Sequence, residues 1–178
     1  VNTLVKKAVE KAQLDLQQRK QTLRLDIAGN IPKIRCDVDR MVQAVGNVLG
    51  NAIKFTPDEG QITVRTRLVR RSRLPEKFSQ NGEDGQCRVS AELIPYVEIS
   101  IADQGIGIAG EDQEAIFEKF YEIGDVEGHS SGKVAFRSRG AGLGLTIVKG
   151  VVAIHGGAVW VESPGHDPET MPGSTFYI

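Results

Sequence analysis

One helical pattern in the first third of the chain constrains its fold more than any other feature. Apolar residues recur with the period of an α-helix at Val38, Met41, Val42, Val45, Val48, Leu49 and Ala52. This period is typical of a helix that buries one face against a core. Asp37 suits the N-cap position, and Pro57 disfavours helical geometry at Thr56, so both ends of this helix are predicted.

The opposite side of this helix carries polar residues at a regular spacing. Asn47 and Asn51 are one helical turn apart and share a face, and Lys54 lies within reach of the same face. An amide oxygen is a hard ligand that suits Mg²⁺, and an ammonium group neutralises phosphate charge. Taken alone, the pattern is also typical of a solvated polar helix face.

The remaining patterns predict a mixed α/β domain. Helical periodicity or helix-breaking residues delimit helices at 3–20, 38–55, 111–120 and 142–155. Alternating apolar residues predict strands at 23–27, 34–36, 61–69, 97–101, 158–162 and 174–178. Because hairpins alternate with crossovers in this order, we expect a mixed sheet with helices packed on one face.

Two glycine-rich clusters follow predicted secondary structure. Asp103 to Ile108 comes after a strand, where a carboxylate can accept a hydrogen bond from an exocyclic amine and glycine permits close backbone approach. Gly140 to Leu145 opens a helix, whose N-terminus attracts phosphate. Each cluster alone is also typical of an ordinary turn. A dinucleotide-binding fold is excluded because a loop, not a first strand, precedes Gly140.

The order of these clusters resembles that of the sensor histidine kinases, members of the Bergerat-fold ATPase superfamily. Their N, G1, F and G2 boxes correspond here to Asn47–Pro57, Asp103–Ile108, Phe117–Phe120 and Gly140–Leu145. The segments 155–157 and 173–176 are similar to the closing segments of the family. The resemblance implies one domain over 1–178, a two-layer α/β sandwich of about five strands under three helices. Residues 72–94 would be an insertion and residues 121–139 the ATP lid.

The resemblance also implies roles for individual residues. Asn51 would bind Mg²⁺ with support from Asn47, Lys54 would face the phosphates, Phe55 would lie near the adenine, and Asp103 would bind the adenine amino group. Basic candidates for the phosphates in the lid are Lys133, Arg137 and Arg139, and Phe117 would anchor one end of the lid or pack in the core. The other residues placed around ATP are Gly105, Gly107, Ile108, Phe120, Gly140, Ala141, Gly142, Leu143, Gly144, Leu145 and Thr175.

The activity implied is transfer of the γ-phosphoryl group of ATP to a histidine. Asn47, Lys54, Arg137 and Arg139 would be the catalytic residues. The acceptor histidine would lie on an upstream dimerisation domain, because none of His129, His155 and His166 stands in the helical context of such an acceptor. We therefore expect the chain to lack its acceptor and to be monomeric, with the whole protein a homodimer that passes the phosphoryl group to a response regulator receiver domain.

ATP hydrolysis and a regulatory role are two alternatives to phosphoryl transfer. Related chaperone, topoisomerase and mismatch-repair ATPases activate water with a glutamate where this chain has Asn47, so hydrolysis is disfavoured as the main activity. A regulatory nucleotide-binding module is a further alternative, and Ala141 is a departure from the Thr or Ser that the family often has. Arginines before the insertion suggest a charged edge strand or a docking patch for an acidic partner. They are Arg65, Arg67, Arg70, Arg71 and Arg73.

Composition limits partners and location. A formal net charge of -1 argues against a nucleic-acid binder that depends on bulk positive charge. No apolar run approaches the about 20 residues that span a bilayer, and no signal-peptide pattern is present. Cys36 and Cys87 are too few for a disulfide framework, which favours a reducing compartment and a cytoplasmic location. Membrane anchoring of the whole protein stays open.

Overall fold

The computed structural model describes residues 1–71, 93–121 and 142–178. In chain order its elements are α1 (Asn2–Gln18), β1 (Thr22–Ile27), α2 (Val38–Phe55), β2 (Gln61–Arg71), β3 (Ile94–Asp103), α3 (Asp112–Ala115), α4 (Gly144–Ile154), β4 (Trp160–Glu162) and β5 (Ser174–Tyr177). The strands form one five-stranded sheet in the order β1-β2-β3-β5-β4. β1 and β2 are parallel and all other neighbours are antiparallel, so the predicted mixed sheet is confirmed.

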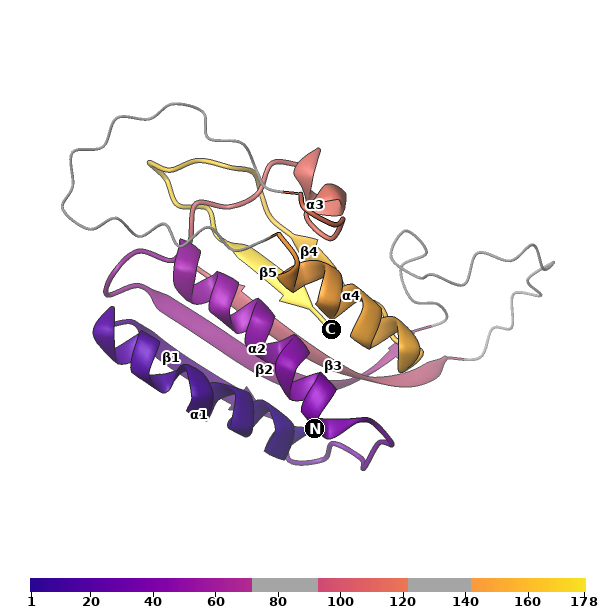
Figure 1. Ribbon diagram of the computed structural model, residues 1–178. Coiled ribbons are helices and arrows are strands. Elements are labelled where there is room, and N and C mark those ends of the chain that lie inside the picture. The colour runs from indigo at the N-terminus through magenta and orange to yellow at the C-terminus, as the bar shows by residue number, and fades with distance from the viewer. Residues whose placement is uncertain (72–92, 122–141) are drawn as a thin grey trace.

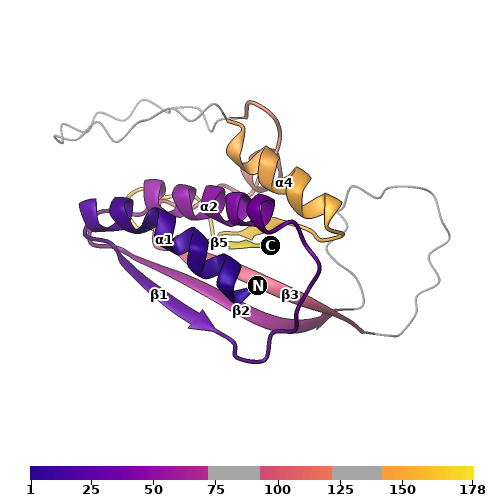
Figure 2. The same ribbon diagram turned by 60° about the horizontal axis from the view of Figure 1, so that its bottom comes forward.

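Helices α1, α2 and α4 cover one face of the sheet, as Figures 1 and 2 show. α2 lies between the other two helices and contacts both of them as well as β3. Its apolar stripe is buried against the inner face of the sheet, where Ile62, Val64, Ile99 and Ile101 are also buried. The two-layer α/β sandwich implied by the sequence is therefore the observed fold.

The ends of α2 lie close to the predicted positions. The Asp37 side chain accepts a hydrogen bond from the Arg40 amide at 3.0 Å, which confirms it as the N-cap. At the other end Thr56 is extended, with ψ 136°, because Pro57 follows it. The register of the sheet places Asp103 opposite Ile62 on one side and opposite Ser174 on the other.

Three predicted elements were wrong in extent or existence. The helix expected at 111–120 is only the four-residue α3, because Phe117 turns into the core and Phe120 has a left-handed φ of 61°. Residues 34–36 form no strand and lie in the described loop between β1 and α2. α4 begins at Gly144 and not at Gly142, whose φ of +61° is not helical.

The predicted insertion and lid fall almost wholly outside the described residues. Ile94, which was assigned to the insertion, is the first residue of β3. Tyr121, which was assigned to the lid, is described, and its hydroxyl donates a hydrogen bond to Asp112. The site candidates Lys133, Arg137, Arg139, Gly140 and Ala141 also lie outside the described part of the chain.

The expectation that the arginines of β2 mark an edge strand is wrong. β2 is an interior strand with β1 and β3 on its two sides. Arg65 and Arg67 form ion pairs with Asp26 on β1, at 3.3 and 3.1 Å. Arg71 pairs with Glu98 at 2.6 Å, and its guanidinium lies 5.1 Å from the centre of the Trp160 ring. These three positive charges are therefore used within the sheet, and the docking patch stays a prediction.

His155 joins the C-terminal end of α4 to the start of α2. Its Nε2 accepts the Asp37 amide at 2.9 Å, and its Nδ1 lies 2.7 Å from the Val151 carbonyl oxygen. This pair of contacts requires a neutral ring that carries its proton on Nδ1. No helix in the described ranges is long and apolar enough to cross a membrane.

Replacing His155 with phenylalanine is expected to destabilise the domain by about 1 to 2 kcal/mol, because both hydrogen bonds are lost while most of the ring volume is kept. Urea unfolding of the two proteins measures the difference. His166→Phe is the matched control, since no side-chain hydrogen bond of His166 is present in the described structure, and it should stay within about 0.5 kcal/mol of the native chain. Equal losses in both variants would contradict this role for His155.

Candidate functional site

The C-terminal end of α2 and the loop after β3 lie against each other. A Cβ atom on Gly105 would come within 2.7 Å of the Phe55 carbonyl oxygen and 2.8 Å of Asp103 Oδ1. Real side chains do not tolerate such distances, so only glycine lets the loop approach the helix this closely. The structure thus brings together two sequence clusters whose contacting residues, Phe55 and Gly105, are 50 positions apart in the chain.

Asp103 is the most perturbed acid of this region. Its Oδ1 accepts the Gly105 amide at 2.8 Å. Burial raises the pKa of Asp103 from 3.8 to about 6, although the backbone amides of Gly105 and Ser174 act in the opposite direction. A carboxyl group that is costly to ionise and retains unused acceptor capacity is typical of a ligand-binding position.

The end of α2 that packs on the Asp103 loop belongs to a helix with a polar face. Asn47 Nδ2 donates a hydrogen bond to the Gly144 carbonyl at 3.1 Å, which ties α2 to the first turn of α4. Among the described residues the Asn51 amide has no hydrogen-bond partner. Lys54 Nζ lies 5.0 Å from the centre of the Phe55 ring, and Phe55 is 45% exposed. The face therefore presents an amide, an ammonium group and an aromatic ring to a ligand.

A second glycine contact fixes the loop from the other side. Gly107 has a φ of +73°, and a Cβ there would lie 1.9 Å from the Gly165 carbonyl oxygen. Gly173 has a φ of +74°, and its amide donates to the Gly105 carbonyl at 2.9 Å. Ile108 is buried and donates its amide to Ser163 Oγ at 3.0 Å. The segment after β4 thus holds the Asp103 loop in place.

Ser163 was not singled out from the sequence. Its hydroxyl accepts the Ile108 amide and lies 2.7 Å from the Gly173 carbonyl oxygen, so it links both sides of the loop contact. The Ser-Pro-Gly turn that follows β4 indicated only a loop. Thr175 pairs with Ala102 and Glu162 inside the sheet, one residue beyond the partner of Asp103.

The two phenylalanines of the third box have different environments. Phe117 is buried and packs edge-on against Phe176, with ring centres 6.4 Å apart. Phe120 is 73% exposed. A Cβ on Gly142 would lie 3.0 Å from the Phe120 Cα atom, so the backbone on either side of 122–141 comes together. Gly144, Leu143 and Leu145 then begin α4 beside Asn47.

A resident metal site built from acids, cysteines or histidines is not found in the described ranges, where no three such side chains cluster. The side chain of Asn51 does suit Mg²⁺, because the ion needs only one or two protein ligands when phosphates and water complete its shell. The residues present therefore fit an ion that arrives with a nucleotide.

The family profile described as "Histidine kinase-, DNA gyrase B-, and HSP90-like ATPase" matches residues 36–178. The chain belongs to this family.

Two named relatives are a sensory protein and a sensor histidine kinase. Drug sensory protein A of Synechocystis sp. is 32% identical over 175 residues, which are 98% of this chain and 22% of the relative. Sensor histidine kinase Hik2 of the same organism is 39% identical over 139 residues, which are 76% of this chain and 26% of the relative. The chain thus spans about a quarter of these two proteins.

A solved structure with the same fold is the mycobacterial sensor histidine kinase MprB. Its identity to this chain is 26% and its TM-score is 0.65. The match covers 99% of this chain and 90% of the other.

Proposed function

We propose that this chain binds ATP with Mg²⁺ and supplies the phosphoryl-donor half of a sensor histidine kinase. The observation that carries the proposal is the buried Asp103 carboxyl, with its pKa raised to about 6, packed beside the end of α2 that bears Asn51, Lys54 and Phe55. Adenine and triphosphate need these two kinds of group, a hydrogen-bond acceptor in a closed pocket and a cationic, oxygen-rich face.

Each group has a role in this proposal. Asp103 accepts a hydrogen bond from the adenine amino group, which GTP lacks at that position, and Phe55 lies against the base. Lys54 neutralises phosphate charge, and Asn51 ligates Mg²⁺ with Asn47 behind it. Mg²⁺, when bound, neutralises phosphate oxygens. Lys133, Arg137, Arg139, Gly140 and Ala141 complete the phosphate side, as the family pattern implies.

The reaction is phosphoryl transfer. A nitrogen of the acceptor histidine attacks the γ-phosphorus, the bond to the β-phosphate oxygen breaks, and ADP leaves. The chain contributes positioning and charge neutralisation, which supply most of the catalysis in such reactions. His155 is unsuited as the acceptor because both of its ring nitrogens are engaged. The acceptor is therefore assigned to an upstream dimerisation domain, and the next recipient to a response regulator.

Asn47 favours transfer over hydrolysis. Its Nδ2 donates to the Gly144 carbonyl oxygen, a contact that a glutamate could not make. No carboxylate is thus available at this position to activate water. The two relatives named above are a sensory protein and a sensor histidine kinase, which also favours transfer. We place the whole protein in the cytoplasm or at its membrane face, as a homodimer.

Calorimetric titration of the purified chain with ATP and GTP, with and without Mg²⁺, tests the proposal. ATP should bind at least about tenfold more tightly than GTP, since GTP leaves the Asp103 carboxylate without a donor. Labelled γ-phosphate should then appear on a histidine when the acceptor domain of the parent protein is added. A folded chain that binds ATP but yields no phosphohistidine would support the regulatory-module alternative. A folded chain that binds neither nucleotide would overturn the proposal.

A further inference from the structure

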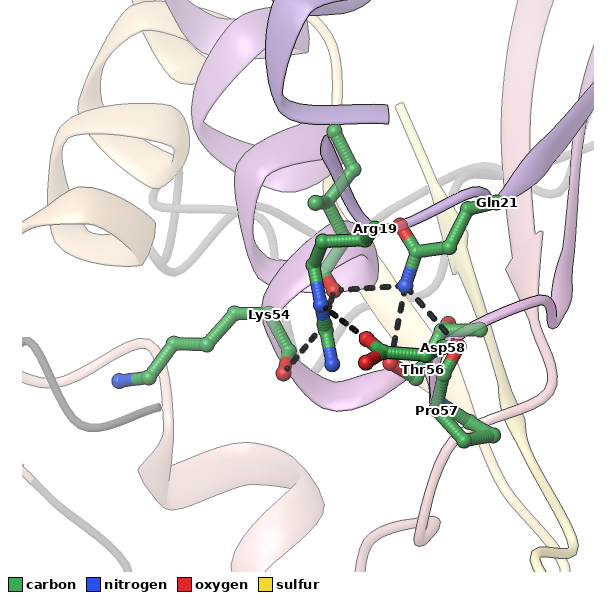
Figure 3. Close-up of polar contacts among 7 residues, drawn as sticks. Arg19, Gln21, Lys54, Thr56, Pro57 and Asp58 are labelled. Atoms are coloured by element: carbon green, nitrogen blue, oxygen red, sulfur yellow. Dashed lines mark hydrogen bonds and ion pairs between the residues drawn. The ribbon is translucent and has the colours of Figure 1, made fainter. Parts of the chain in front are cut away.

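The turn after α1 delivers two neighbouring polar side chains to the end of α2. Lys20 has a left-handed φ of 53°, and the Gln21 amide closes α1 by donating to the Leu16 carbonyl at 2.9 Å. This sharp turn directs Arg19 and Gln21 toward the last turn of α2 (Figure 3). Gln21 is buried, with 8% exposure, and Arg19 keeps only 11% of its side chain exposed.

The last turn of α2 needs hydrogen-bond donors from other elements because the residues that follow it in the sequence supply few. A helix end leaves carbonyl groups unpaired, and a glycine in the left-handed region usually satisfies some of them. Here Pro57 forces Thr56 into an extended conformation, so that kind of cap is not formed. The exposed carbonyls therefore depend on donors from elsewhere in the fold.

Gln21 and Arg19 supply those donors. Gln21 Nε2 lies 3.1, 2.9 and 3.2 Å from the carbonyl oxygens of Ile53, Thr56 and Pro57. Arg19 donates to the carbonyls of Ile53 and Lys54. The positive charge of Arg19 is also favourable at the negative end of the helix dipole. Among the described residues, by contrast, the buried Gln21 Oε1 has no partner, so the residue serves through its NH₂ group.

The same helical turn carries residues of the proposed ATP site. Lys54 belongs to it, and its side chain points away from Arg19 and Gln21 in Figure 3. The Phe55 carbonyl oxygen packs on Gly105 instead, so the Asp103 loop is held against this turn by a contact separate from those of Arg19 and Gln21. Arg19 and Gln21 themselves belong to neither of these clusters.

We propose that Arg19 and Gln21 are positioning residues that hold the last turn of α2 where Lys54 meets the nucleotide phosphates. The inference rests on the proposed function. It assigns a role in phosphate binding to the connection between α1 and β1, which lies outside the family boxes and carries no phosphate ligand itself.

Binding of ATP and of adenosine to Arg19→Met and Gln21→Met, compared with the native chain, tests this. Adenosine reports on the base pocket alone, whereas ATP also reports on Lys54. Each variant should lose about five- to tenfold in ATP affinity, equivalent to about one or two lost hydrogen bonds, and less than about twofold in adenosine affinity. Arg19→Lys, which keeps a charge and a donor, should restore ATP binding to within about twofold of native.

Two controls separate positioning from general stability. Asp58→Asn removes the negative charge of the exposed partner of Arg19 but keeps the carbonyl contacts, so both affinities should stay native. Val5→Ala weakens the core under α1 and should lower the unfolding midpoint without changing the ratio of the two affinities.

The ratio of ATP to adenosine affinity decides the outcome. A native ratio in the folded Arg19 and Gln21 variants, or an equal loss of both ligands, would overturn the inference and leave the proposed function intact. Absence of ATP binding by the native chain would overturn both.

Discussion

Replacing Asp103 with asparagine is expected to weaken ATP binding about a hundredfold, the effect of losing a buried charged acceptor. Asp103 Oδ1 already accepts the Gly105 amide. An asparagine that keeps this contact would present its NH₂ group to the nucleotide, so a donor would face the amino group of adenine. The loss should be specific for the base, and adenosine should be affected as strongly as ATP.

The same substitution is expected to stabilise the ligand-free domain above pH 6. The folded chain holds the Asp103 proton up to about pH 6, whereas the unfolded chain releases it near pH 3.8. Between these values the folded state binds more protons, so its stability falls as pH rises, by up to about 3 kcal/mol from this group. Asparagine cannot ionise and should be free of this loss.

Urea unfolding at pH 4 to 8 and calorimetry with ATP measure both effects. Asp15→Asn, which changes an exposed aspartate of α1, is the control and should alter neither quantity. A variant that binds ATP natively would refute the role of Asp103 in binding. A variant with the pH dependence of the native chain would show that the group is not buried as described.

Gly107→Ala is expected to lower the free energy of unfolding by about 3 kcal/mol or more, since it combines a left-handed alanine with overpacking. The new methyl group would meet the Gly165 carbonyl oxygen at 1.9 Å and Pro172 at 2.7 Å. Both belong to the segment that holds the Asp103 loop. ATP affinity should therefore fall together with stability.

Gly110→Ala is the matched control, because a Cβ there has no neighbour within 4 Å. It should stay within about 0.5 kcal/mol of the native chain. Thermal unfolding and ATP titration of both variants provide the measurements. Equal stability of Gly107→Ala and Gly110→Ala would mean that the loop lies further from residue 165 than described.

Local rules predicted the part of the site that depends on short-range sequence. Asp37 and Pro57 delimit α2 through an N-cap and through restricted backbone geometry, and the structure agrees with both. Burial alternates along the first half of β2 and along β5, but not along β1 or β3. The five strands of the mixed sheet agree with the predicted fold class. Asp103 and Gly105 were identified because the order of the clusters resembles the boxes of the sensor histidine kinases, since an acid and glycines after a strand are alone also typical of an ordinary turn.

Long-range contacts could not be predicted in the same way. The expected helix at 111–120 ends early because Phe117 packs on Phe176, which is distant in the sequence. Arg19 and Gln21 lie in an unremarkable polar stretch, and their function depends on carbonyls more than thirty residues away. The interior position of β2 likewise depends on strand pairing, which composition does not reveal.

The position of β5 has a consequence for how the domain is made. β5 is the last strand in the chain, yet it lies between β3 and β4 in the sheet and pairs with both. During synthesis one edge of β3 therefore stays unpaired until residues 174–177 have been made and can pair with it. Ser174 is also the strand partner of Asp103. Nascent chains that stop before β5 should thus be poor at both folding and nucleotide binding, and prone to pair through β3 with other chains.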